Sequence, residues 1–109
     1  MTVTKARMDW GKLKLEMNGH ANAAEKGRDI VCAAESMLTQ ALLQTLLEMN
    51  EEKKLWLEWT GSAAAGYLKM EAAPLEDYKA EVRACFRICV TGLRMLAEKY
   101  PEYIELEEG

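Results

Sequence analysis

The side chains with the most reactive chemistry in this sequence of 109 residues are one histidine and three cysteines. His20 follows a segment that alternates like a strand, and Cys32 lies near the expected start of a helix. A thiolate is a strong nucleophile, and a nearby imidazole can take up its proton and later protonate a leaving amine. A short loop can bring a strand end and a helix start together, so His20 and Cys32 are a candidate catalytic pair.

The place of Cys32 in its helix bears on its reactivity. Asp29 is a good helix N-cap, and it puts Cys32 at about the third helical position. The first turn of a helix has free N–H groups and the positive end of the macrodipole, which favour a thiolate and can hold an oxyanion. A cysteine in an apolar helical run is, however, more often part of the core, so spacing alone leaves both interpretations open.

The elements that must position this pair follow from hydrophobic periodicity. Alternation with period two predicts strands, and apolar residues three and four apart predict helices. His20 falls in a small, polar segment that predicts a loop at 20–28. The expected strands are 2–8, 12–17, 55–59, 64–71 and 103–106, and the expected helices are 29–49 and 75–99.

This order, β-β-α-β-β-α-β, favours a two-layer α+β fold. We expect a mainly antiparallel sheet of about five strands with two long helices packed on one face. The length suits a single domain spanning residues 1–109. Any active site must then lie on the surface of that domain or at a subunit interface.

Composition argues against several classes of function. The formal net charge is -4 and no stretch gathers Lys and Arg, which speaks against direct binding of nucleic acid. The start of the chain lacks the apolar core of a signal peptide, and polar residues interrupt the apolar run at 37–47, which argues against a membrane span. An odd number of cysteines without a secretory signal favours reduced thiols and a cytoplasmic protein.

The segment from Gly19 to Ser36 resembles the signature of the ribosomal-processing cysteine proteases, the Prp or YsxB-like family. The segment reads GHANAAEKGRDIVCAAES. The family shows Gly-His-Ala, a short loop with Gly, then Asp-Ile-Val-Cys-Ala and a Ser one turn further on. The similarity extends to a hairpin before the motif, a middle hairpin, and a last helix that runs into Tyr100-Pro101 and a short strand.

The resemblance implies that His20 is the catalytic histidine and Cys32 the nucleophile. Ser36 matches a serine one helical turn beyond Cys32 that supports the site, and Asp29 matches the acidic position of the motif. The family's loop is thought to move when substrate binds. Its positions here are Gly19, Ala21, Asn22 and Gly27.

Two positions depart from the family pattern. Asn22 stands where the family usually has Asp, and Glu35 stands where a small or apolar residue is common. Glu35 would raise the pKa of the Cys32 thiol if it pointed at the site. On a helix it can equally face solvent, and we expect that orientation.

The activity that the resemblance implies is cleavage of the N-terminal extension of the large-subunit ribosomal protein bL-twenty-seven. A Cys-His dyad would perform it without a cofactor, and the partner would be the precursor's N-terminal peptide. A homodimer is also implied. The acidic charge of the chain is compatible with a basic ribosomal substrate.

A zinc site is the chemical alternative. The only histidine and the three cysteines, His20, Cys32, Cys85 and Cys89, could supply a Cys3His set. Cys85 and Cys89, however, fall on the apolar stripe of the second helix, so we expect them to pack in the core.

The non-catalytic alternative is a small dimeric interaction module, for example a ribosome-assembly factor. The apolar surface that it needs could come from Trp56 and Trp59. These residues alternate to opposite faces of their strand, so one helical layer cannot bury both.

Overall fold

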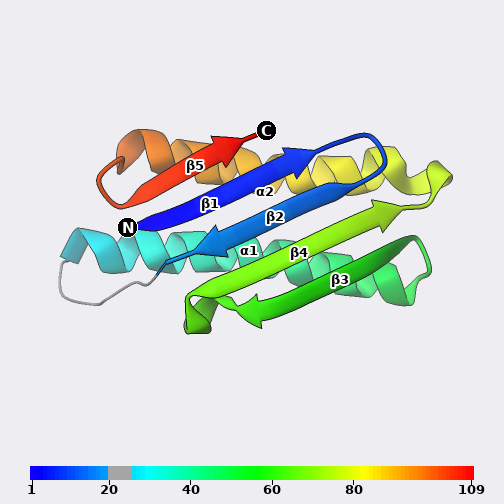
Figure 1. Ribbon diagram of the computed structural model, residues 1–109, viewed down its shortest axis with the longest axis horizontal. Coiled ribbons are helices and arrows are strands. Elements are labelled where there is room, and N and C mark those ends of the chain that lie inside the picture. The colour runs from blue at the N-terminus through cyan, green and yellow to red at the C-terminus, as the bar shows by residue number, and fades with distance from the viewer. Residues whose placement is uncertain (20–25) are drawn as a thin grey trace.

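The computed structural model describes the backbone of residues 1–19 and 26–109 and the side chains of these residues other than 26–29 and 64. Strands and helices follow one another in the expected order (Figure 1). The strands are β1 (Thr2–Met8), β2 (Leu13–Asn18), β3 (Leu55–Ser62), β4 (Tyr67–Pro74) and β5 (Ile104–Glu108). The long helices are α1 (Lys26–Glu51) and α2 (Lys79–Lys99), and two short 3-10 helices are η1 (Ala63–Ala65) and η2 (Glu76–Tyr78).

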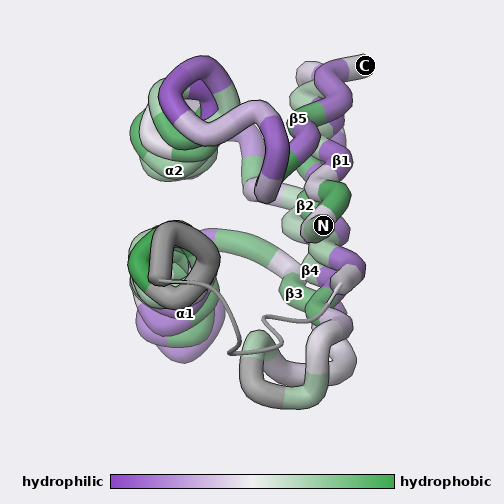
Figure 2. The backbone as a smooth tube through the Cα atoms, turned by 90° about the vertical axis from the view of Figure 1, so that its left-hand side faces the viewer, coloured by the Kyte–Doolittle hydropathy of each residue, from purple (hydrophilic) through white to green (hydrophobic). Residues whose placement is uncertain are grey.

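The strands form one sheet in the order β3-β4-β2-β1-β5. Neighbouring strands are antiparallel except β1 and β5, which are parallel. Both long helices lie side by side on the same face of this sheet, and the other face is open (Figure 2). The predicted fold class, a two-layer α+β structure with a mainly antiparallel sheet, is therefore confirmed.

The alternation along the central strands decides which face the helices cover. In β2 the side chains that face the helices are buried, and those between them line the open face. α2 adds Phe86 and Leu93, whose side chains have no exposed surface. Removing this apolar surface from water is the main force that holds the helices on the sheet. The buried residues of β2 are Leu13, Leu15 and Met17.

One stripe of α1 is buried against the sheet and α2. Its members recur at three- and four-residue spacing, as helical packing requires. By length and composition, Ile30–Glu51 could also cross a membrane, with a mean hydropathy of 1.4. A helix that is buried in the core of a globular protein can be equally long and apolar, so the length and hydropathy of this helix are weak evidence for a membrane span. The buried stripe consists of Val31, Glu35, Thr39, Leu42, Leu46 and Met49.

Several expected boundaries are wrong. β4 begins at Tyr67 and not at Ala64, because Ala63–Ala65 forms η1, and α2 begins only at Lys79, after η2. α1 begins at Lys26 and not after a cap at Asp29, so Gly27 lies in its first turn. One glycine costs a helix only about 1 kcal/mol, and its neighbours are good helix formers. β4 continues to Pro74, where we expected a stop before it. Proline is tolerated there because it ends the strand, paired with Leu55 of the edge strand β3.

Truncating the core beneath α2 should unfold the protein more readily. Phe86→Ala leaves a cavity in a fully buried site, and we expect it to lower the free energy of unfolding by about 3–5 kcal/mol. Ile88→Ala, at a side chain that is 73% exposed, is the matched control and should change it by less than about 0.5 kcal/mol. Urea denaturation followed by circular dichroism measures both. Equal losses in the two variants would contradict the packing described.

Candidate active site

The candidate nucleophile, Cys32, lies on α1 and its side chain is half-buried. It is the seventh residue of the helix counted from Lys26, where we expected about the third. The N–H groups without an intrahelical partner belong to the first four residues, and the macrodipole acts mainly within the first turn. The expectation that Cys32 lies among free N–H groups, which hold an oxyanion, is therefore wrong. The cause is the earlier start of the helix.

Cys32 borders the buried stripe of α1. Val31 before it is buried and Ile30 is 63% exposed, so the thiol lies at the margin between core and solvent. Ser36 follows at a spacing of four and is half-buried as well. Residues four apart on a helix are neighbours on one face, which brings Ser36 to the same margin as Cys32.

Glu35 is the residue at this site that sequence reasoning misplaced. We expected it to face solvent, but its side chain is only 2% exposed. The hydroxyl of Thr4 on β1 donates a hydrogen bond to Glu35 Oε2 at 3.1 Å. Burial raises the pKa of the Glu35 carboxyl above its usual 4.5, and the hydrogen bonds from Thr4 and Thr2 only partly oppose this. The signal in the sequence was its place in the apolar stripe, three residues beyond Cys32.

The other two thiols have different surroundings. Cys89 is 4% exposed, and its Sγ donates to the carbonyl oxygen of Leu38 at 3.5 Å. Burial, followed by the charge of Glu35, raises the pKa of Cys89 to about 12. Burial also raises the pKa of Cys85, which lines the shallow groove between α1 and α2. The prediction that the α2 cysteines pack in the core is confirmed for Cys89, whereas Cys85 is half-buried.

Of the remaining predicted site residues, Gly19 directly follows β2, whose end points toward the same end of the molecule as the start of α1 (Figure 1). His20, Ala21 and Asn22 lie outside the described residues, and their roles stay predictions. Gly19 has φ of +132°, and a Cβ added there would lie 2.6 Å from the carbonyl oxygen of Met1. Its N–H donates to the carbonyl oxygen of Gly66, just beyond η1, at 2.9 Å. Only glycine fits this conformation and spacing, and Gly19 thereby fixes where the chain leaves the sheet toward His20.

The zinc alternative receives no support from the described part of the chain. Among residues 1–19 and 26–109, no group of three His, Cys, Asp or Glu side chains is placed to hold a metal ion. The two α2 cysteines lie in and beside the apolar core, where they pack against apolar side chains.

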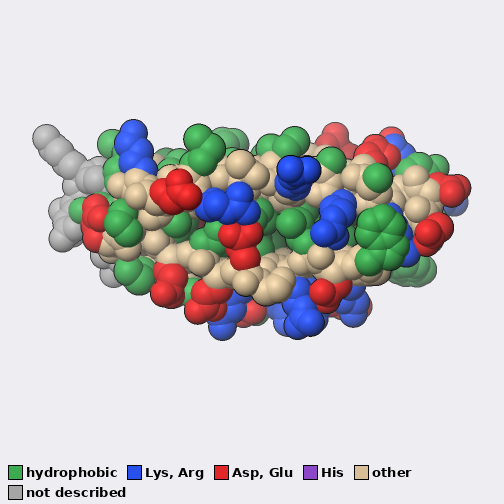
Figure 3. Space-filling view, turned by 90° about the horizontal axis from the view of Figure 1, so that it is seen from above, with side chains coloured by type: hydrophobic (Ala, Val, Ile, Leu, Met, Phe, Trp, Pro, Cys, Tyr) green, Lys and Arg blue, Asp and Glu red, His purple; other side chains and the backbone are tan. Residues whose placement is uncertain are grey.

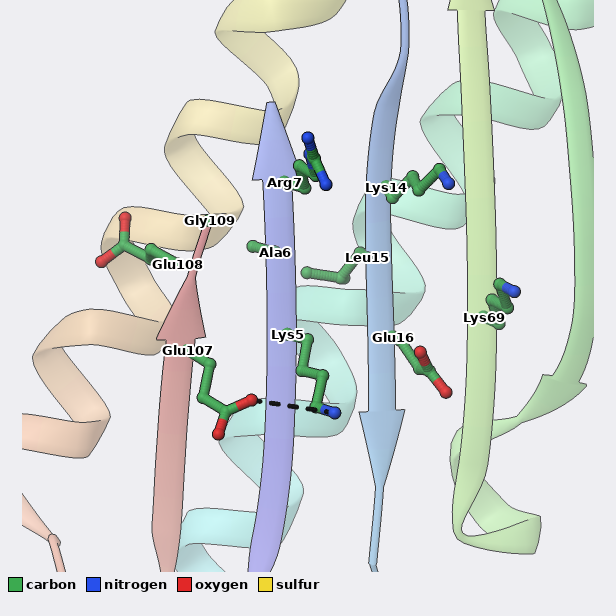
Figure 4. Close-up of a pocket in the computed structure, with 10 residues that line it drawn as sticks. All are labelled: Lys5, Ala6, Arg7, Lys14, Leu15, Glu16, Lys69, Glu107, Glu108 and Gly109. Carbon is green, nitrogen blue, oxygen red and sulfur yellow. Dashed lines mark ion pairs between the residues drawn. The ribbon is translucent and has the colours of Figure 1, made fainter. Parts of the chain in front are cut away.

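The open face of the sheet has a hollow of about 320 Å³ between β5, β1 and β2. Figure 4 shows its charged side chains, with an ion pair between Lys5 and Glu107 at 3.8 Å. None of the residues around it is a cysteine or histidine, and it lies on the face opposite the helices. It is therefore separate from the Cys32 site. Its charged residues are Lys5, Arg7, Lys14, Glu16, Lys69, Glu107 and Glu108.

Charge on the molecule is mixed in sign. Seen along the edge formed by β5 and α2, Lys and Arg side chains lie among Asp and Glu side chains, with apolar groups between them (Figure 3). Arg94 of α2, for example, pairs with Glu108 of β5 at 2.7 Å. The side chains that the structure describes form no continuous basic stripe on this edge, in line with the sequence argument against nucleic acid.

Comparison with protein families assigns the chain to the cysteine proteases, and the fold and the cysteine on α1 agree with this class. The sequence model of the family described as cysteine protease Prp matches residues 1–105. The chain belongs to the Prp family and is a cysteine protease. This decides against the non-catalytic interaction module.

Individual relatives resemble this chain in sequence or in fold. The ribosomal processing cysteine protease Prp of Mycoplasma pneumoniae is 30% identical over 97 residues, which cover 87% of this chain and 86% of that protein. The crystal structure of the SMU.848 protein from Streptococcus mutans has a TM-score of 0.75 and 27% identity over 99% of this chain and 93% of that one. The ribosomal processing protease Prp of S. aureus, crystallised with a substrate peptide, has a TM-score of 0.77 at 21% identity over the whole of both chains, which supports the fold.

The three thiols should differ in reactivity toward iodoacetamide. A pKa of about 12 for Cys89 leaves roughly one thiolate in 10⁴ at pH 8, and burial raises the pKa of Cys85 as well. Because alkylation requires the thiolate, Cys32 should be modified first, and the rate at Cys89 should rise with pH well above 8. Mass spectrometry of peptides after timed quenching measures each rate.

Cys32→Ala should remove the fast phase of alkylation, and Cys85→Ala is the matched control that should keep it. Equal rates at all three thiols would contradict the difference in their surroundings.

Proposed function

We propose that this protein is the endopeptidase that removes the N-terminal extension of the bL-twenty-seven precursor, with Cys32 as nucleophile and His20 as general acid and base. The observation that carries the proposal is the match to the family signature from Gly19 to Ser36 in a chain that belongs to the family over residues 1–105. The curated relative from Mycoplasma pneumoniae is a ribosomal processing protease. Cys32 is also the one thiol on α1, the helix that follows the histidine segment in the chain.

The chemistry follows from these two groups. His20 takes the proton of the Cys32 thiol, and the thiolate attacks the carbonyl carbon of the scissile peptide bond. The C–N bond breaks when the imidazolium gives its proton to the leaving amine, and the N-terminal fragment stays on Cys32 as a thioester. Water, deprotonated by His20, then attacks the thioester carbonyl. The fragment leaves as a carboxylic acid and the thiol is restored.

The other predicted site residues complete this proposal. Ser36 lies one helical turn beyond Cys32 on α1 and would support the thiol, and Asp29 matches the acidic position of the family motif. The substrate loop would include Gly19, Ala21, Asn22 and Gly27. We place the activity in the cytoplasm, where ribosomal proteins are made and where thiols stay reduced.

Cleavage of a peptide that spans the precursor's processing site tests the catalytic pair. Cys32→Ala and His20→Ala should each lower kcat/KM by at least about 10³-fold, because each removes one half of a unit that acts together. Cys85→Ala should retain activity within about threefold, because its thiol packs between the helices and takes no part. Chromatography of the products measures the rates. Cleavage by Cys32→Ala at the wild-type rate would refute the assignment.

We also propose that the protein is a homodimer that pairs through the outer face of α1. From Ile30 to Leu47 the only charged residue is the buried Glu35, so the exposed side of this stretch is uncharged. Met37, at its centre, is 67% exposed. A large uncharged patch is typical of a protein–protein interface, and a second copy would cover it with an identical patch.

Light scattering coupled to gel filtration tests the dimer. We expect a mass of about twice the 12.3 kDa of one chain. The Met37→Glu variant should have the measured mass of one chain, because dimerisation would bury the unpaired charge of the new carboxylate in the interface. Met95→Glu, at a position on α2 that is 65% exposed, is the control and should leave the dimer intact. A wild-type protein with the mass of one chain would contradict the proposal.

A further inference from the structure

The buried carboxyl of Glu35 has no step in the reaction above, yet it lies three residues beyond Cys32 on the same helix. Residues three apart on a helix are neighbours, so any force that fixes Glu35 also fixes the turn that carries the thiol. Glu35 is at the same time among the deepest polar side chains of the protein, at 2% exposure.

Two threonines of β1 hold the carboxyl. Thr4 is fully buried and donates to Glu35 Oε2 at 3.1 Å, and the hydroxyl of Thr2, itself 3% exposed, lies near enough to help lower the pKa of the carboxyl. Thr2 and Thr4 are alternate residues of β1, so they point to the same face of the sheet, the face that the helices cover. The contact therefore spans the two layers and joins β1 to the helix that carries Cys32.

Thr39 of α1 and Cys89 of α2 also lie beside this turn. The hydroxyl of Thr39 donates to the carbonyl oxygens of Glu35 and Ser36 at 3.0 and 3.2 Å. On the α2 side, Cys89 lies close enough to Glu35 for a charged carboxyl to raise the pKa of its thiol. Glu35 thus lies where β1, α1 and α2 meet.

Stability does not account for a carboxyl at this position. Burying a carboxyl is costly, and replacing a buried polar cluster by apolar residues of similar volume is often neutral or stabilising. A hydrogen bond differs from apolar packing because it fixes direction as well as distance. Among the side chains that the structure describes, no buried nitrogen or oxygen lacks a hydrogen-bond partner, so the cluster is complete.

We propose that Glu35 is a positioning residue for the protease reaction: its contact with Thr4 and Thr2 of β1 sets the orientation of the α1 turn that carries the Cys32 thiol. The inference rests on the proposed role of Cys32 as nucleophile. What Glu35 contributes in this proposal is the direction that its hydrogen bond with Thr4 fixes, and this does not require a negative charge. A neutral side chain with the same shape and an acceptor oxygen should therefore replace it.

Kinetics of the precursor peptide test the proposal in two matched pairs. Glu35→Leu and Thr4→Val remove the hydrogen bond, and we expect kcat to fall by roughly 10–100-fold with KM changed less than about threefold, because a misplaced nucleophile slows chemistry without weakening binding. Glu35→Gln and Thr4→Ser keep an acceptor and a donor and should retain kcat within about threefold. The double variant Glu35→Leu with Thr4→Val should unfold at the same or a higher urea concentration than the wild type.

A folded Glu35→Leu variant with wild-type kcat would overturn the positioning role, and so would a Glu35→Gln variant as impaired as Glu35→Leu. Amide hydrogen exchange gives a readout that does not depend on cleavage. The amides of residues 31–36 should exchange faster in Glu35→Leu than in the wild type, and unchanged exchange would also overturn the proposal. The wild type could fail to cleave the peptide while Glu35→Leu still speeds amide exchange at residues 31–36. In that case the proposed substrate is wrong, and the role of Glu35 in orienting α1 is supported.

Discussion

Two helices cover one face of the sheet, and the position of the site depends on this burial. The apolar residues of β2 and β4 alternate with charged ones, so helices can cover one face only. α1 must then present a continuous buried stripe from Val31 to Met49. Cys32 directly follows the first buried residue of that stripe, and this is why its thiol lies at the margin of the core. The same packing places the thiols of α2 between the helices.

Two polar features determine the geometry at the end of the molecule that carries the site. The positive φ of Gly19 and its bond to the carbonyl oxygen of Gly66 fix the exit of β2 beside η1. The hydrogen bond between Thr4 and Glu35 joins β1 to α1 within the core. The first controls where the histidine segment starts, and the second controls how the thiol-bearing turn lies on the sheet. Both are hydrogen bonds, which fix the relative orientation of the groups they join, whereas burial of apolar surface is non-directional.

The sequence predicted the order of elements and the fold class because strand and helix periods are local properties that burial of one face enforces. It failed where the outcome depends on tertiary contacts. Asp29 looked like a cap because Asp is a common N-cap and an apolar helical pattern follows it, but α1 extends back to Lys26. Glu35 looked solvent-exposed because charged residues usually are. Only the packing of α1 on β1 in the folded structure shows that Thr4 and Thr2 lie beside the Glu35 carboxyl.

The candidate nucleophile and its histidine came from the match of a whole segment to a family, and spacing alone would have left Cys32 equally well explained as a core residue. The measurement that tests the central claim most directly is rapid quenching of the protein during turnover of the precursor peptide, followed by mass spectrometry of the protein. The account predicts the N-terminal fragment of the peptide linked to Cys32 as a thioester, formed and lost within one turnover. A fragment linked to Cys85 or Cys89, or turnover with no protein-linked fragment, would contradict it.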